Sequence, residues 1–186
     1  MIVWLFSVLG CQQAPLPEPG HRVGADMQFV RGATFRMGTD ESELGAIREA
    51  VGLRSIGLLM TEVPSRAVSV ADFYIDTYSV SNADYLRFVS VEPSWSREQL
   101  DSDSHNGRYL EHWQDGAPPQ ALLQHPVTFV TWQAAVAYCA WRDKRLPTEA
   151  EYEWAAQDGE SRHEFPWGDA LPSDKLVSWG GNGIDQ

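Results

Sequence analysis

The two cysteines of this chain, Cys11 and Cys139, are the side chains that could be lipidated, oxidised or bound to a soft metal. Cys11 ends the sequence Val8-Leu-Gly-Cys11, at the close of an apolar run from Ile2 to Leu9 that is too short to span a bilayer. This arrangement has the form of a bacterial lipobox, in which the cysteine receives a lipid after the leader is cleaved. We therefore predict lipidation at Cys11, with residues 1–11 as the signal segment of an exported lipoprotein anchored in the cell envelope.

The N-terminal segment also departs from an ordinary export signal. No Lys or Arg precedes the apolar run, whereas signal peptides normally begin with positive charge. The alternatives are a true start upstream of the recorded one, or a short hydrophobic N-terminus without a targeting role. Residues 12–26 contain Ala14-Pro-Leu-Pro-Glu-Pro-Gly20, which indicates an extended tether ahead of a fold that begins near Met27.

A lipid on Cys11 would leave Cys139 without a partner in this chain, so we expect no internal disulfide. Cys139 lies in an apolar helical pattern, which indicates a small buried hydrophobe rather than a reactive thiol. The sequence has no Cys/His spacing of the kind that binds zinc. Thiol chemistry is therefore not expected from the cysteines alone.

The acidic and histidine residues offer few further candidates for chemistry. Helix capping and solvated charge explain three closely spaced glutamates better than catalysis does: Glu149, Glu151 and Glu153. His105 and His112 stand seven apart in a polar stretch and share no helical face, so we interpret them as solvent residues. Trp95 and Trp113, in the same stretch, are expected to pack rather than to bind a ligand.

The charge balance excludes some partners. The chain has 26 acidic and 14 basic residues, which gives a formal charge of −12. Nucleic acid and anionic membrane surfaces would repel it, so membrane contact is expected only through the lipid anchor. A divalent cation would suit this charge, but a solvated acidic surface is the simpler interpretation. With 43% hydrophobic and 11% aromatic residues among 186, the composition is that of one globular domain.

The elements that would hold these residues begin with short alternating segments. Met27 to Val30 and Thr34 to Gly38 alternate as strands do, with residues 31–33 as the turn between them. A single further strand is indicated over residues 68–75. Residues 44–51 have one apolar face, which fits a short helix.

A firmer helix begins after Ser81, which can act as its N-cap by accepting a hydrogen bond from the amide three residues on. Val80 can pack against Tyr85 as a hydrophobic staple. Residues 90–124 then form a long polar excursion with weak patterning. Residues 125–130 return as a strand.

Two more helices follow in the pattern. Thr131 caps the first, whose core-facing residues recur at i, i+3, i+4 and i+7: Trp132, Ala135, Val136 and Cys139. Thr148 and Glu151 form a capping box for the second helix, which Gly159 should end. Short strands, short helices and many loops together predict an irregular α+β domain.

One sequence near the end stands out from these common signals: Leu146-Pro-Thr-Glu-Ala-Glu151, followed by Phe165-Pro-Trp-Gly168. Other distinctive stretches precede it in order: Phe35-Arg-Met-Gly38, Glu62 to Val68, Phe73-Tyr-Ile75, Tyr78-Ser-Val-Ser-Asn82, His125-Pro-Val127, Val130-Thr-Trp132 and Ala137-Tyr-Cys-Ala-Trp141. This succession resembles the formylglycine-generating enzyme family, also called the sulfatase-modifying factor family. The matching residues are mainly caps, helix faces and aromatic core positions.

The resemblance implies a loop-rich C-type-lectin-like fold over residues 27–186, incomplete at the C-terminus. It also implies an activity, the oxidation of a cysteine in a protein or peptide substrate to formylglycine with molecular oxygen and copper. In active family members two cysteine thiolates bind the copper, and such soft ligands suit Cu(I). These cysteines follow the Pro-Trp-Gly segment, so we assign this chain no catalytic or copper-binding residue and expect it to be inactive alone.

The family also has a calcium site, formed in part by an Asn after Pro-Trp-Gly and by the carbonyl of the next residue. Asn182 and Gly183 match these positions, and calcium binds amide and carbonyl oxygens. The alternative is that this stretch is only a flexible turn. The chain departs from the family at Ala134, where Asp is usual, and in the inverted order of Tyr152 and Trp154. These departures affect capping and packing rather than chemistry.

Three functions remain open on the sequence. The first is the front part of an exported oxidase of the formylglycine-generating type. The second is a non-catalytic ligand-binding or interaction module on the same scaffold, since loops on a rigid fold suit binding. The third is an iron enzyme of the thiol-histidine sulfoxide synthase type. That type needs a His-rich iron-binding region, whereas this chain has five scattered His.

Overall fold

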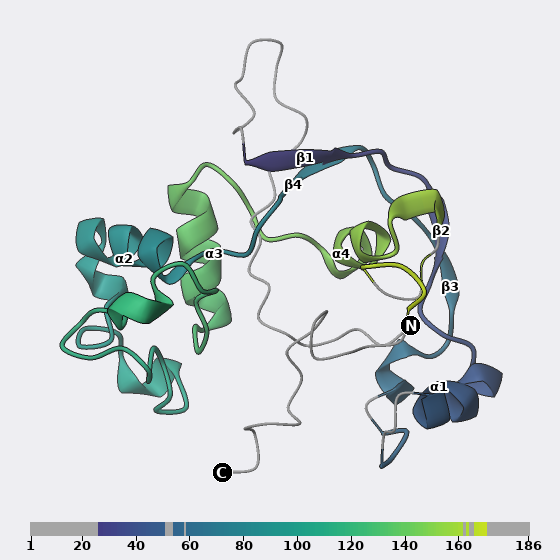
Figure 1. The fold of residues 1–186 in the computed structure, drawn as a ribbon, viewed down its shortest axis with the longest axis horizontal. Coiled ribbons are helices and arrows are strands. Elements are labelled where there is room, and N and C mark those ends of the chain that lie inside the picture. The colour runs from purple at the N-terminus through teal and green to yellow at the C-terminus, as the bar shows by residue number, and fades with distance from the viewer. Residues whose placement is uncertain (1–25, 51–53, 58, 162, 164–165, 171–186) are drawn as a thin grey trace. The chain divides into compact units, whose positions relative to one another are not determined.

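The computed structural model describes residues 26–50, 54–57, 59–161, 163 and 166–170. The chain divides into two compact units, whose helices and strands are shown in Figure 1. The first unit takes its described residues from 32–71 and 149–170, and the second from 26–31 and 72–148. Both combine short antiparallel strands with helices, which confirms the α+β class. Within these described ranges no helix is both long and apolar enough to cross a bilayer.

The first unit contains an antiparallel pair formed by β2 (Thr34–Met37) and β3 (Arg66–Ser69). Phe35 lies opposite Val68 in the register. Phe35 and Met37 are buried whereas the residues beside them on β2 are exposed, as expected for a strand with one face on a core.

Two helices complete the regular structure described for the first unit. α1 (Leu44–Ala50) follows a turn of 3₁₀ helix and buries Leu44. α4 (Glu149–Ala156) packs against β2, as Figure 1 shows. The rings of Phe35 and Trp154 meet there with centroids 5.0 Å apart, and both side chains are buried.

The second unit has its own antiparallel pair, β1 (Met27–Val30) with β4 (Phe73–Asp76). It also contains α2 (Asn82–Val91) and α3 (Trp132–Trp141), which pack side by side (Figure 1). Residues 92–131, which we call the α2–α3 connection, contain turns of 3₁₀ helix, isolated bridges at Pro126 and at Gln114 with Ala117, and otherwise irregular backbone.

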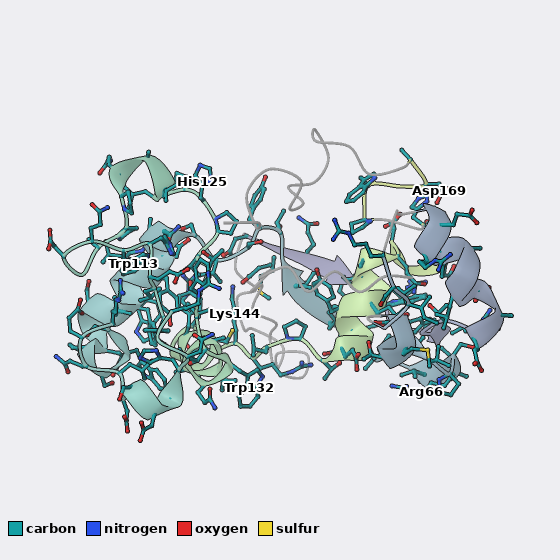
Figure 2. The ribbon with its side chains drawn as sticks, turned by 90° about the horizontal axis from the view of Figure 1, so that it is seen from below. Arg66, Trp113, His125, Trp132, Lys144 and Asp169 are labelled. Atoms are coloured by element: carbon teal, nitrogen blue, oxygen red, sulfur yellow. The ribbon has the colours of Figure 1, made fainter. Side chains whose placement is uncertain are left out.

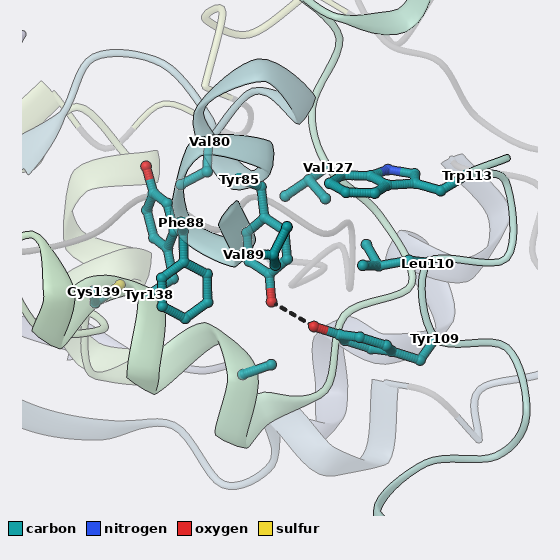
Figure 3. Packing of buried hydrophobic residues seen from close by; sticks show 11 residues of the cluster. Val80, Tyr85, Phe88, Val89, Tyr109, Leu110, Trp113, Val127, Tyr138 and Cys139 are labelled. Carbon is teal, nitrogen blue, oxygen red and sulfur yellow. Dashed lines mark hydrogen bonds between the residues drawn. The ribbon is translucent and has the colours of Figure 1, made fainter. Parts of the chain in front are cut away.

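Aromatic rings form the core of the second unit (Figure 3). The rings of Tyr85 and Tyr138 stack at 5.6 Å, and Phe88 meets Tyr138 edge-on at the same separation. Trp113 is buried and Trp95 packs against the cluster, which confirms that these two residues serve packing. The other members are Val80, Val89, Tyr109, Leu110, Val127, Ala134 and Cys139.

The predicted helix starts are confirmed. Ser81 accepts a hydrogen bond of 3.1 Å from the amide of Asp84, and Thr131 accepts one of the same length from the amide of Ala134. α4 begins directly after Thr148, as the capping box predicted. α4 ends at Ala156, earlier than predicted, and Asp158 reaches the left-handed region (φ +54°) one residue before Gly159 (φ +59°).

The predicted strand partners are wrong. β1 pairs with β4 and β2 with β3, so residues 31–33 do not form a hairpin turn, and the single strand expected over 68–75 is two strands. Residues 125–130 form one isolated bridge, from Pro126 to Ser81, instead of a strand. Alternation reports an extended backbone but carries no information on its partner. The sequence also gives no indication of the close backbone approach at Gly32, where a Cβ would lie 2.3 Å from the Val70 carbonyl oxygen.

The predicted core face of α3 is half wrong. Ala135 and Cys139 are buried, but Trp132 is 70% exposed and Val136 is 37% exposed. Tyr138 takes the central buried place, against Tyr85 and Phe88. Because α3 is apolar on nearly every side, its pattern does not select a face, and the rings of α2 do.

Cys139 is completely buried on α3, as predicted for a small hydrophobe. It is nevertheless disulfide-bonded, so the expectation that it would form no disulfide is wrong. That expectation depended on a lipid at Cys11, which lies outside the described residues.

Candidate functional site

The residues assigned to sites from the sequence are Cys11, Asn182 and Gly183, and all three lie outside the described residues. Lipidation and calcium binding therefore stay predictions. Among the described residues, two clusters of buried polar side chains attract notice, one in each unit. The cluster of the second unit is centred on Asn82 and that of the first unit on Glu153.

Asn82, at the first position of α2, is 1% exposed, and its side chain makes hydrogen bonds to five residues of the α2–α3 connection. Its Nδ2 donates to the carbonyl oxygens of Leu122, His125 and Pro126, at 3.0, 3.1 and 3.3 Å. Its Oδ1 accepts a bond of 2.9 Å from Trp113 Nε1. Trp113 and His125 are labelled in Figure 2. A buried amide with this many partners fixes the connection against α2.

His112 adds a further bond to the same Asn82 oxygen, with its Nε2 3.1 Å from Oδ1. The three carbonyl oxygens facing Nδ2 fix the orientation of the amide, so Oδ1 is an acceptor and His112 Nε2 must donate. His112 Nδ1 is consequently the unprotonated nitrogen, and it is buried without a hydrogen-bond partner. The interpretation of His112 as a solvent residue is therefore wrong. Its sequence context, a polar stretch, carried no signal of this contact.

Backbone strain accompanies His112 in the connection. Leu110 and Phe129 have φ of +47° and +58°, which bulky residues rarely adopt. The amide of Leu110 donates to the Phe129 carbonyl at 2.9 Å, so the two strained residues support each other. The Phe129 ring lies 6.0 Å from the ring of His112 and 4.4 Å from the guanidinium carbon of Arg108. Strain of this kind persists only where surrounding contacts enforce it.

The hydroxyl groups of Tyr85 and Tyr109 are linked by hydrogen bonds within the core of the second unit. Tyr109 donates to the carbonyl oxygen of Trp95 at 2.7 Å, so Tyr85, whose oxygen is 2.8 Å from that of Tyr109, must donate to Tyr109 (Figure 3). Burial raises the pKa of Tyr85, and it raises the pKa of Tyr109 to about 12. Both side chains are therefore neutral phenols, which position rings and do not act as bases.

The cluster of the first unit has the carboxyl group of Glu153 at its centre. Glu153 is 1% exposed, and its Oε1 accepts hydrogen bonds from the Gly38 amide at 2.9 Å and from Gln157 Nε2 at 3.1 Å. Its Oε2 is buried without a partner. The pKa of Glu153 is raised by burial, and that of Glu62 is raised by burial and by the nearby charge of Glu153. The interpretation of Glu153 as solvated charge is therefore wrong, and Glu151, at 9% exposed, is also buried.

The described residues do not fit a copper site. A Cu(I) site of the expected kind needs two thiolates, and Cys139 is disulfide-bonded inside α3 with no exposed surface. In the described ranges no cluster of three or more His, Cys, Asp or Glu residues could hold a metal ion. We therefore derive no reaction step through copper for these residues.

A comparison with known protein families identifies the family of this chain. Residues 13–182 match the family described as sulfatase-modifying factor enzyme 1-like domain. The chain belongs to the sulfatase-modifying factor family. In this family member, the Gly38–Glu153 hydrogen bond joins elements of one unit, and Asn82 and the caps of α2 and α3 do so in the other.

Relatives of this sulfatase-modifying factor domain include both enzymes and an inactive paralogue. Formylglycine-generating enzyme from Mus musculus is 33% identical over 170 residues, which cover 76% of this chain and 42% of the mouse protein. The enzyme from Thermomonospora curvata is 29% identical over 180 residues, 80% of this chain and 54% of that protein. Inactive C-alpha-formylglycine-generating enzyme 2 from Mus musculus is 31% identical over 208 residues, 97% of this chain and 61% of that protein. The chain spans about half the length of these relatives.

Proposed function

We propose that this chain forms the scaffold of a formylglycine-generating domain with a C-type-lectin-like fold. On this proposal the domain acts on a cysteine in a protein or peptide substrate, with oxygen and copper, once thiolates outside these 186 residues complete the copper site. The observation that carries the proposal is the family match over residues 13–182, together with Cys139, which is disulfide-bonded and supplies no free thiolate. The chain contributes the packed helices and loops on which such a site depends.

An aldehyde assay tests this function. The purified 186-residue chain and the complete product of its gene are each incubated with Cu(I), oxygen and a cysteine-containing sulfatase peptide, and aldehyde is measured by mass spectrometry. Mouse formylglycine-generating enzyme is the positive control. We expect aldehyde from the complete product and none from the 186 residues. Aldehyde from the 186 residues alone would contradict the proposal that the copper-binding thiolates lie outside them. The absence of aldehyde from both forms would contradict the oxidase function.

A non-catalytic interaction module is the second candidate. It is favoured by the likeness to the inactive mouse paralogue, which extends over 97% of this chain. The second unit also presents large aromatic side chains to solvent, with Tyr78 81% exposed and Trp132 70% exposed. If the chain is such a module, substitution of Tyr78 or Trp132 by Ser should weaken binding of the cysteine-containing sulfatase peptide without changing the unfolding free energy. In an oxidase without such a role, both variants would bind the peptide as the wild type does.

We further propose that the protein is exported and lipidated at Cys11. A sulfur atom that carries a lipid cannot join a disulfide, and Cys11 is the only cysteine besides Cys139. On this proposal the disulfide partner of Cys139 therefore lies outside these 186 residues, whereas a disulfide between Cys139 and Cys11 would contradict the proposal. Mass spectrometry of the protein from envelope fractions separates these two outcomes, because a lipid adds several hundred daltons whereas a disulfide removes two hydrogens. A Cys11→Ser variant should lose membrane attachment if the lipobox works.

Calcium binding at Asn182 and Gly183 is proposed on the family resemblance alone. Calcium takes amide and carbonyl oxygens, and these two residues supply one of each. Calorimetric titration of the complete gene product with Ca²⁺ tests the proposal, with Asn182→Ala as the variant. Equal calcium affinity in the variant and the wild type would reject Asn182 as a ligand.

A further inference from the structure

The contacts of Asn82 join distant parts of one long segment. The side chain of Asn82 bonds Trp113 in the middle of the α2–α3 connection and three carbonyl groups near its end. Since Asn82 begins α2, these bonds bind the connection to the helix that precedes it. The irregular backbone of the connection has little ladder bonding of its own, so its position depends on side chains such as this one.

The role of His112 in these contacts depends on its protonation state. Neutral His112 donates through Nε2 to Asn82 Oδ1 and keeps a lone pair on the buried Nδ1. Protonation places a second N–H on Nδ1, where the structure offers no acceptor. The added proton therefore creates a buried, unsatisfied donor and a positive charge in the same step.

The charged groups around His112 do not offset that cost. Arg97 lies close by, because its Nη1 is 3.2 Å from the Glu111 carbonyl oxygen and 3.4 Å from that of Trp113. Arg108 lies on the ring of Phe129, which also contacts the His112 ring. The Glu111 carboxylate favours a charged imidazole, but it is already paired with Arg108, with 2.6 Å between Nη2 and Oε1. Burial, with Arg97 in support and Glu111 opposed, lowers the pKa of His112.

We propose that Asn82 and His112 form a proton-sensitive clasp, which holds the α2–α3 connection on the start of α2 at neutral pH and loosens it in mild acid. The clasp is closed while His112 is neutral and donates to Asn82. Protonation of Nδ1 forces the ring to seek solvent, and the Nε2 bond to Asn82 breaks.

The direction of the pH effect follows from linkage. A histidine with a lower pKa in the folded state than in the unfolded state binds its proton more readily when unfolded. Its contribution to stability is therefore fully present above the unfolded value, about 6.5, and is lost as pH falls through the folded value. The clasp should be closed at pH 7.5 and weakened near pH 5.

Nuclear magnetic resonance of the ¹⁵N-labelled full chain tests the closed state directly. Long-range nitrogen spectra should show His112 with its proton on Nε2 at pH 7.5. The titration midpoint of His112 should lie below that of a histidine in an unfolded reference peptide. Amide signals of residues 110–113 should shift with the same midpoint. A proton on Nδ1, or a midpoint at or above that of the peptide, would overturn the proposal.

A pair of variants tests the coupling to stability. His112→Gln keeps an N–H donor near the Nε2 position but cannot titrate, and His125→Gln removes an exposed imidazole as the matched control. Between pH 7.5 and 5, the folding equilibrium constant from urea titration should fall at least about threefold further in the wild type and in His125→Gln than in His112→Gln. Equal falls in all three proteins would overturn the clasp. If His112→Gln does not fold, the wild-type nitrogen spectra decide.

Discussion

Glu153 Oε1 accepts a hydrogen bond of 2.9 Å from the backbone amide of Gly38, which fastens α4 to the residue that follows β2. The two residues are 115 positions apart in the sequence. Gly38 has a φ of +80°, and a Cβ at that position would lie 2.4 Å from the carbonyl oxygen of Glu62. A glycine and a buried carboxyl group are thus required together at this junction.

The Glu153 carboxyl group should make the first unit less stable as pH rises. Its folded pKa is raised by burial above the unfolded value, so its contribution is present below that value and is lost as pH rises through the folded pKa. Glu153→Gln keeps an oxygen for the Gly38 amide and removes the titration. We expect the variant to gain stability relative to the wild type between pH 5 and 8, measured by urea unfolding. Glu160→Gln, at an exposed position shortly after the same helix, is the control and should keep the pH trend of the wild type.

Gly38→Ala should destabilise the first unit by about 3 kcal/mol, from a left-handed backbone and a clash together. Gly107→Ala separates the two causes. Gly107 has a similar φ, +84°, but a Cβ there would meet nothing within 4 Å. Its cost should be only about 1 kcal/mol, the conformational part. Equal costs in thermal or urea unfolding would show that the contact with Glu62 relaxes freely.

Asn82 should tolerate neither truncation nor its nearest isostere. Asn82→Ala leaves Trp113 Nε1 and three carbonyl groups without their bonds, at a cost of about 3 kcal/mol in unfolding free energy. Asn82→Asp should cost at least as much, because a carboxylate oxygen would face those carbonyl oxygens. Asn106→Asp, at an exposed site of the same connection, keeps its acceptor role and should cost little. A mild effect of Asn82→Asp would argue against the amide orientation.

The Lys144–Asp76 pair gives a fourth prediction. Nζ lies 2.5 Å from Oδ1, and the side chains are only 9% and 11% exposed. Lys144→Met leaves a buried carboxylate without its main cation and should cost about 3 kcal/mol. Arg87→Met breaks an ion pair in which Arg87 is 68% exposed, and should cost no more than about 0.5 kcal/mol. Similar losses for both variants would show that Asp76 is satisfied by other groups.

Local signals predicted the starts of α2, α3 and α4, because Ser81, Thr131 and Thr148 act within one helical turn. Strand pairing could not be read in the same way, since β1 and β4 meet across more than forty residues of chain and alternation names no partner. The face of α3 was ambiguous because Trp132 and Tyr138 both carry large aromatic rings, and only the packing against the rings of α2 distinguishes them.

The candidate clusters were harder to predict than the fold. Glu153 looks like any helix-surface glutamate in sequence, and its burial depends on the end of β2. His112 sits in a stretch without periodicity, so its contact with Asn82 follows only from tertiary structure. Gly38 and Asn82 stand in stretches that resemble the family, but the physical reason for each appears only when the contacts are seen.

Asn82 also determines where this scaffold can change in length. Its side-chain amide donates a hydrogen bond to the carbonyl oxygen of Leu122, 40 positions away, and so holds the two ends of the α2–α3 connection together. Residues 101–104, beyond the contacts of the clasp, are exposed. The entropy of closing a loop grows only with the logarithm of its length, so doubling it costs about 0.6 kcal/mol. Insertions at 101–104 should thus be nearly neutral, and new recognition loops can be grafted there while the helices beneath stay as they are.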